Sequence, residues 1–80
     1  MAKEYTQEQL ERYAMLVLEA IEGHGYGYSR RKGIQRSTKL NDRALQRAVW
    51  HLEAKGLVEH EDYRPLGITE EGQAWLEDRL

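Results

Sequence analysis

The chain contains no cysteine, so two structural devices are excluded at once. Without cysteine there is neither a disulfide framework, the usual staple of a small secreted domain, nor a thiolate metal site. Apolar runs are short as well, and none approaches the roughly 20 residues needed to cross a bilayer. The first residues lack the apolar stretch of a signal peptide. These absences predict a cytoplasmic protein.

Residue patterns typical of catalysis are missing too. The sequence has no phosphate-binding glycine loop and no nucleophile motif, and its carboxylates show no obvious acid–base pairing. His24, His51 and His60 are not spaced as a helical i, i+4 pair, and no cysteine supports them as metal ligands. We therefore expect a protein that is not an enzyme and that uses neither a metal nor a cofactor.

The composition that is present is that of one small folded domain. The 80 residues are 40% hydrophobic and 32% charged, which fits a single domain over 1–80. A chain of this length buries only about 60% of its unfolded surface, so its core is thin. Met15, Leu16 and Trp75 broaden the apolar faces of their segments. We expect a homodimer whose interface is formed by the first helix, alone or with the last.

The overall net charge of −2 hides a strong segregation of charge. Between Gly23 and Trp50 there are seven basic residues and one acid, Asp42, a net charge of +6, and the rest of the chain carries −8. Such asymmetry within one small domain indicates a polyanionic partner on one side. The alternative is a basic helix face that is only solvated.

The first half of the chain predicts two helices. Thr6 and Gln9 form a capping box before a helix that Gly23 ends. Glycines alternate with histidine and tyrosine over 24–28, which predicts a loop or a short extended segment that caps the core or pairs with a strand. A second, weaker helix is expected over about 29–40.

The second half predicts a well-defined helix, a hairpin and a last helix. Asn41 is a strong N-cap for a third helix at about 42–55, and Gly56 is placed to end it. Extended segments at 57–60 and 66–68 flank a hairpin turn that contains the single proline, Pro65. Thr69 can then cap a final helix.

The predicted fold class is mainly α with a small β-hairpin: a three-helix core, a two- to three-stranded antiparallel sheet and a C-terminal helix. The stretch from Lys32 to Val58, with its ending Leu52-Glu53-Ala54-Lys55-Gly56-Leu57-Val58, resembles the DNA-reading core of winged helix-turn-helix transcription regulators. These include the MarR-like, ArsR-like and PadR-like groups and small archaeal and viral regulators. Leu66-Gly67-Ile68-Thr69-Glu70-Glu71-Gly72 is similar to the ending of their wing strand. Two residues depart from the pattern: Gln35 replaces a small residue, and Lys39 a glycine or small polar one.

The resemblance implies sequence-specific binding of double-stranded DNA, with the helix at about 42–55 in the major groove. An α-helix fits that groove, and its N-terminal residues usually contact the bases. The expected base-reading residues are Asn41, Arg43, Gln46 and Arg47. The expected phosphate-binding residues are Arg30, Arg31, Lys32, Arg36, Lys39 and Arg64.

Several alternatives remain open on the sequence alone. Acidic outer helices and the acidic hairpin residues Glu59, Glu61 and Asp62 would also suit a winged-helix protein-interaction module, because a fold does not fix a function. RNA binding, or architectural nucleic-acid binding without sequence preference, is a third possibility. Trp50 could lie on the sugar–phosphate backbone, in a partner interface, or beneath the hairpin.

Overall fold

The computed structural model describes residues 5–23, 28–59 and 66–79. Within these ranges the chain forms four helices and three short strands. In chain order they are α1 Gln7–Gly23, β1 Tyr28–Ser29, α2 Arg31–Thr38, α3 Asp42–Ala54, β2 Val58–Glu59, β3 Leu66–Ile68 and α4 Glu70–Arg79. The prediction of a mainly helical chain with a small antiparallel sheet is confirmed. None of the described helices is long and apolar enough to span a membrane.

The first helix begins at the capping box that the sequence predicts. The Thr6 amide donates to Gln9 Oε1 at 3.0 Å, and the Gln9 amide donates to Thr6 Oγ1 at 3.1 Å. Two amides that the helix leaves unpaired are thereby satisfied. The Tyr5 ring meets the Tyr13 ring edge-on, with centroids 5.5 Å apart, which fixes the chain just before the helix.

The second helix is shorter than predicted at both ends. Ser29 lies opposite Leu66 in the sheet, so it cannot begin a helix. Lys39 adopts a left-handed conformation, with φ 59° and ψ 20°, and its amide donates to the Gln35 carbonyl at 2.8 Å. A residue in this conformation ends a helix. The expected span of 29–40 is therefore wrong by about two residues on each side.

The third helix has both of the ends that the sequence predicts. Asn41 Oδ1 accepts from the Ala44 amide at 2.8 Å, as an N-cap does. At the other end Gly56 has a φ of 71°, and the Leu57 amide donates to the Leu52 carbonyl at 2.9 Å. These are the marks of a Schellman ending. The helix stops at Ala54, one residue before the predicted limit.

The sheet has three strands in the order β1-β3-β2, and both pairings are antiparallel. The predicted hairpin is confirmed by the pairing of Val58 with Ile68. Tyr28, opposite Gly67, adds the third strand, so the expectation that the tyrosine segment pairs with a strand is met at Tyr28. The rest of that segment, including His24, lies outside the described residues.

The hairpin turn at 60–65, with His60, Arg64 and Pro65, also lies outside the described residues.

The start of the last helix is held tightly against the end of the third. Thr69 Oγ1 accepts from the Gly72 amide at 3.0 Å, as predicted for an N-cap, and also donates to the Gly56 carbonyl at 2.8 Å. The Thr69 amide donates to the Leu57 carbonyl at 3.1 Å. A Cβ on Gly72 would overlap the Leu57 carbonyl oxygen and lie 2.9 Å from Ile68 Cγ1. Glycine is therefore required there by close packing.

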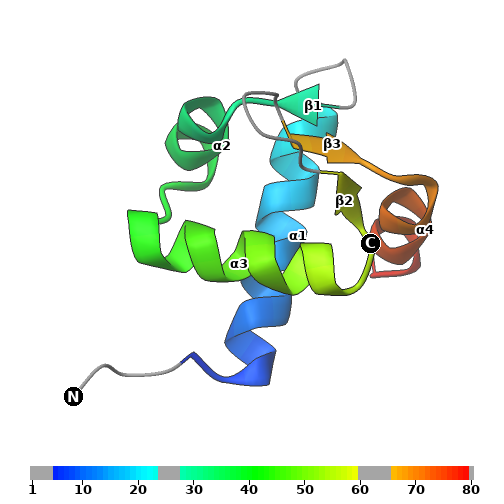
Figure 1. Ribbon diagram of the computed structural model, residues 1–80, viewed down its shortest axis with the longest axis horizontal. Coiled ribbons are helices and arrows are strands. Elements are labelled where there is room, and N and C mark those ends of the chain that lie inside the picture. Colours follow the sequence, from blue (N-terminus) through cyan, green and yellow to red (C-terminus); the bar gives the residue numbers. More distant parts are fainter. Residues whose placement is uncertain (1–4, 24–27, 60–65, 80) are drawn as a thin grey trace.

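The core gathers around α1, which contacts the other three helices and the sheet. The largest fully buried side chains of the whole core are Val17, Leu18, Ile21, Ile34, Val49, Leu52, Leu66 and Leu76. Figure 1 shows α3 crossing α1, with α2 beside the N-terminal end of α3 and with the sheet and α4 near its C-terminal end. The core thus holds α2 and the start of α3 together at one end of the molecule.

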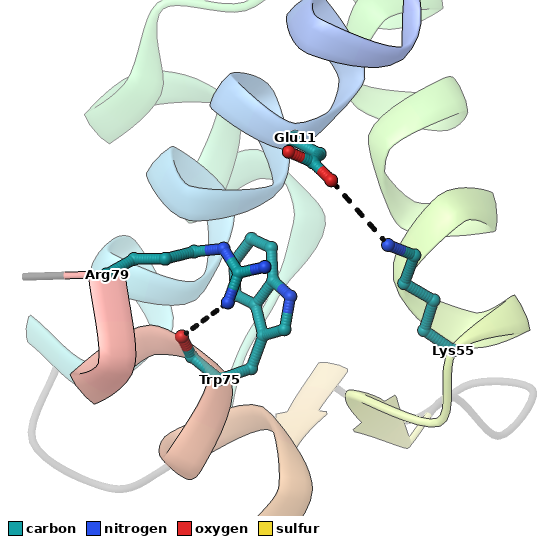
Figure 2. A network of polar contacts seen from close by, with 4 residues as sticks. All are labelled: Glu11, Lys55, Trp75 and Arg79. Carbon is teal, nitrogen blue, oxygen red and sulfur yellow. Dashed lines mark hydrogen bonds and ion pairs between the residues drawn. The ribbon is translucent and has the colours of Figure 1, made fainter.

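Figure 2 shows two separate polar contacts on the outside of the molecule, one between α1 and the residue that follows α3, and one within α4. Lys55 Nζ lies 3.9 Å from Glu11 Oε1, and both side chains are partly exposed. The Arg79 guanidinium lies 3.8 Å from the Trp75 ring centroid and donates to the Trp75 carbonyl at 3.1 Å. The exposed Glu11–Lys55 pair adds about 0–1 kcal/mol, so it orients α3 on α1 more than it stabilises the fold.

Candidate nucleic-acid interface

Two side-chain hydrogen bonds tie α2 to the first half of α3. Arg31 Nη1 donates to Gln46 Oε1 at 2.7 Å, and Gln35 Nε2 donates to Asp42 Oδ1 at 2.7 Å. Gln35, which departs from the regulator pattern, is half-buried and fills its position with a polar contact. The two bonds place the outer faces of the two helices next to each other.

The expected row of donors along α3 is present. Asn41, Arg43 and Arg47 are exposed, whereas Leu45 on the opposite face is buried. Gln46 is half-buried rather than exposed, because its side chain lies against α2. The four residues predicted to read bases therefore lie together at the start of α3 and on its first two turns.

The predicted phosphate-binding residues gather mainly on and around α2. Arg30, Lys32, Arg36 and Lys39 are exposed, and Arg31 is half-buried through its bond to α3. A shallow, open depression of about 300 Å³ on the surface of α2 is lined by Lys32, Gln35 and Arg36.

Arg64, the sixth predicted phosphate contact, lies outside the described residues.

Two of the predicted base-reading residues have hydrogen-bond partners within the protein. Asn41 caps α3, which its residue type and position do indicate. The Arg31–Gln46 bond joins residues 15 positions apart, so no local sequence pattern predicts it. The structure thus couples a predicted phosphate contact directly to a predicted base contact.

Trp50 is the exposed aromatic residue of this surface. Its side chain is 53% exposed, and the Arg47 guanidinium lies 5.6 Å from the centroid of its ring. The interpretation that Trp50 packs beneath the hairpin is therefore wrong. Its position extends the exposed row on α3 by one helical turn beyond Arg43 and Arg47.

The described helices outside this surface are acidic. The carboxylates of α1 and α4 are Glu8, Glu11, Glu19, Glu22, Glu70, Glu71, Glu77 and Asp78. Each of these two helices carries one basic residue, Arg12 in α1 and Arg79 in α4. By contrast, α2 contains no acid. The charge segregation of the sequence is therefore also a segregation in space, with the cations around α2 and the start of α3.

His51 occupies a site of a different kind, between α3 and α1. Its Nε2 atom is buried and has no hydrogen-bond partner. Burial lowers the pKa of His51, Lys55 lowers it further, and Glu11 opposes both effects. Within the described ranges no group of three or more His, Asp or Glu side chains is arranged to hold a metal ion. Burial of this side chain therefore disfavours its charged form.

Comparison with protein families, with curated proteins and with solved structures finds no match for this chain.

Proposed function

We propose that the protein is a winged helix-turn-helix domain that binds double-stranded DNA in a sequence-specific manner, as a transcription regulator does. The observation that carries the proposal is the group of exposed cations on and next to α2 and the first half of α3. These cations are Arg30, Lys32, Arg36, Lys39, Arg43 and Arg47. Two hydrogen bonds join the two helices, while α1 and α4 are acidic.

In this proposal α3 enters the major groove and α2 crosses the backbone. The groove is about 12 Å wide and admits one α-helix. Arg43 and Arg47, exposed on consecutive turns, would contact base edges, and Lys32 and Arg36 would bind phosphates. Trp50 would rest on the sugar–phosphate backbone beyond the last base contact. The acidic helices would face away from the DNA.

The left-handed Lys39 supports the resemblance to winged-helix regulators. The regulator pattern has a glycine or a small polar residue there, and glycine adopts a positive φ without steric cost. A lysine that takes the same conformation keeps the same chain path between α2 and α3. It adds a cation where the two helices meet.

We further propose that the domain acts as a homodimer through α1. Leu16 is 38% exposed, and its neighbour Met15 packs against the core while remaining partly exposed. A two-fold dimer would place two α3 helices about 34 Å apart, one turn of the duplex, on a palindromic site. Light scattering at tens of micromolar protein tests this: the dimer mass is expected for the unmodified protein, and a monomer mass for Leu16→Glu. A monomer mass for the unmodified protein contradicts the dimer.

Titration of duplex DNA at several salt concentrations tests the function itself. Affinity is expected to fall steeply as salt rises, because each phosphate contact releases counterions. Lys32→Gln and Arg36→Gln should each reduce the slope of log K against log salt by about 1 without changing base preference. Arg43→Gln and Arg47→Gln should relax the base preference.

The matched control is Arg12→Gln, which removes the same charge from an exposed position on α1. Its affinity and salt slope should equal those of the unmodified protein. If Arg12→Gln weakens binding as much as Arg43→Gln does, the surface assigned to DNA is wrong. Absence of duplex binding at low salt would instead favour a protein-interaction module.

A further inference from the structure

We propose that the exposed half of α3 selects guanine. Its arginines carry donors alone, and the amide oxygens of Asn41 and Gln46 are turned toward donors within the protein. This inference rests on the proposed function and adds the class of base that the surface reads.

The amide of Asn41 has one orientation available to it. Its partner is the backbone amide of Ala44, at 2.8 Å, and a backbone amide can only donate. The side-chain oxygen must therefore face Ala44, which leaves the NH₂ group of Asn41 as its outward group. Asn41 thus offers donors at the start of the helix.

Gln46 is oriented in the same way by Arg31. A guanidinium has donors and no acceptor, so the oxygen of Gln46 must face Arg31 Nη1, at 2.7 Å. A free glutamine can pair with adenine through both its oxygen and its NH₂ group. Here the oxygen is turned toward α2 in a partly buried bond, so the NH₂ group is what Gln46 presents to a base.

The remaining residues of the row strengthen this bias. Arg43 and Arg47 are exposed and carry donors alone. Asp42 is the acid of this segment, and one of its oxygens already accepts from Gln35 Nε2 at 2.7 Å. The Asp42 carboxylate, at the first residue of α3, still has lone pairs that can accept from a base.

Guanine fits this arrangement better than the other bases do. In the major groove guanine presents two acceptors, N7 and O6, whereas adenine pairs an acceptor with a donor. Cytosine presents a donor, and thymine presents one acceptor beside a methyl group. Donors from Arg43, Gln46 and Arg47 match successive guanines. The Asp42 carboxylate suits the N4 donor of a cytosine in the same G·C-rich segment.

The test begins with selection of bound duplexes from a random pool, which should enrich sites with guanines on one strand of each half-site. Each enriched guanine is then replaced by 7-deazaguanine, which lacks the N7 acceptor and pairs normally. Affinity of the unmodified protein should fall about 5- to 150-fold at each guanine that α3 reads. Enriched sites without guanine, or sites indifferent to 7-deazaguanine, would overturn the inference while leaving DNA binding intact. Failure to bind any duplex at low salt would overturn the proposed function as well.

A pair of variants isolates the role of Arg31. Arg31→Met frees the oxygen of Gln46, so adenine should become acceptable at one position where the unmodified protein requires guanine. Arg36→Met removes an equal charge from the same helix and should weaken binding with no change of preference. Thermal unfolding checks that both variants are folded. If Arg31→Met keeps guanine at every position, the Arg31–Gln46 bond does not set the preference.

Discussion

Replacing Gly72 by alanine tests how closely α4 packs against the end of α3. Alanine favours a helix over glycine by about 1 kcal/mol, which alone would stabilise the protein. The added Cβ, however, would overlap the Leu57 carbonyl oxygen and lie 3.1 Å from the Leu57 carbonyl carbon. These are backbone atoms that cannot rotate away, so the cost lies near the upper end of the range of about 1–3 kcal/mol for overpacking.

A shift of α4 would also strain the hydrogen bond from the Thr69 amide to the Leu57 carbonyl, which is worth about 1 kcal/mol. The net expectation for Gly72→Ala is a loss of about 3 kcal/mol in the free energy of unfolding. A domain of this size is stabilised by only about 4–12 kcal/mol, so the loss is a large part of the total. It corresponds to a decrease of roughly 12–24 °C in Tm.

The assay is urea unfolding followed by far-UV circular dichroism, with Gly23→Ala as the matched control. Gly23 is the last residue of α1, and a Cβ there would meet nothing within 4 Å. Gly23→Ala should therefore leave stability unchanged or raise it by up to about 1 kcal/mol. A Gly72→Ala midpoint equal to or above that of the unmodified protein would refute the close packing of α4 on Leu57.

Three further predictions concern single residues. Lys39→Val should lower the free energy of unfolding by about 1–2 kcal/mol, because a left-handed backbone disfavours a β-branched residue. Lys39→Asn should be nearly neutral, and equal urea midpoints for the two variants would contradict the left-handed conformation at this position. Folding lowers the pKa of His51 below 6.5, so His51 binds a proton more readily in the unfolded state than in the folded state. The contribution of His51 to stability is therefore full above pH 6.5 and is lost as the pH falls below that value. Urea midpoints from pH 8 to 5 should decline less in His51→Leu than in the unmodified protein, and equal declines would exclude the effect. Thr69→Val removes two hydrogen bonds at the start of α4 and should cost about 1–3 kcal/mol by the same assay, so an unchanged midpoint would contradict that network.

The ends of helices other than α2 could be predicted from the sequence where they depend on a few neighbouring residues. Thr6 with Gln9, Asn41, Gly56 and Thr69 all act as their types and positions indicate. Capping involves side chains and backbone groups within about one turn, so the relevant partners are visible in the local sequence.

The second helix shows where local reasoning fails. Ser29 is an acceptable N-cap by type, but its pairing with Leu66 places it in the sheet, and that partner is distant in the sequence. The left-handed backbone conformation of Lys39 is also not indicated by its residue type, because that conformation favours glycine or asparagine.

The grouping of basic side chains on one face of α3 could be predicted from the sequence, but the hydrogen bonds around them could not. Charge segregation and helical periodicity were enough to group Arg43 and Arg47 on one exposed face. The Arg31–Gln46 bond depends on how α2 and α3 cross, which is set by the packing of the core. The sequence does not determine the surroundings of Trp50, because its position on α3 is compatible with several.

The order of the strands has a consequence for how the chain folds as it is synthesised. The central strand, β3, is the last of the three along the chain, so β1 has no partner until Leu66 and Gly67 have been made. The first three helices form contacts close in sequence, whereas joining β1 to β3 closes a long loop at an entropic cost. During this interval we expect β1 of the nascent chain to have an unpaired edge. Such an edge is a template for pairing with a strand of another chain. Synthesis of β3 by the same chain removes that edge from contact with others.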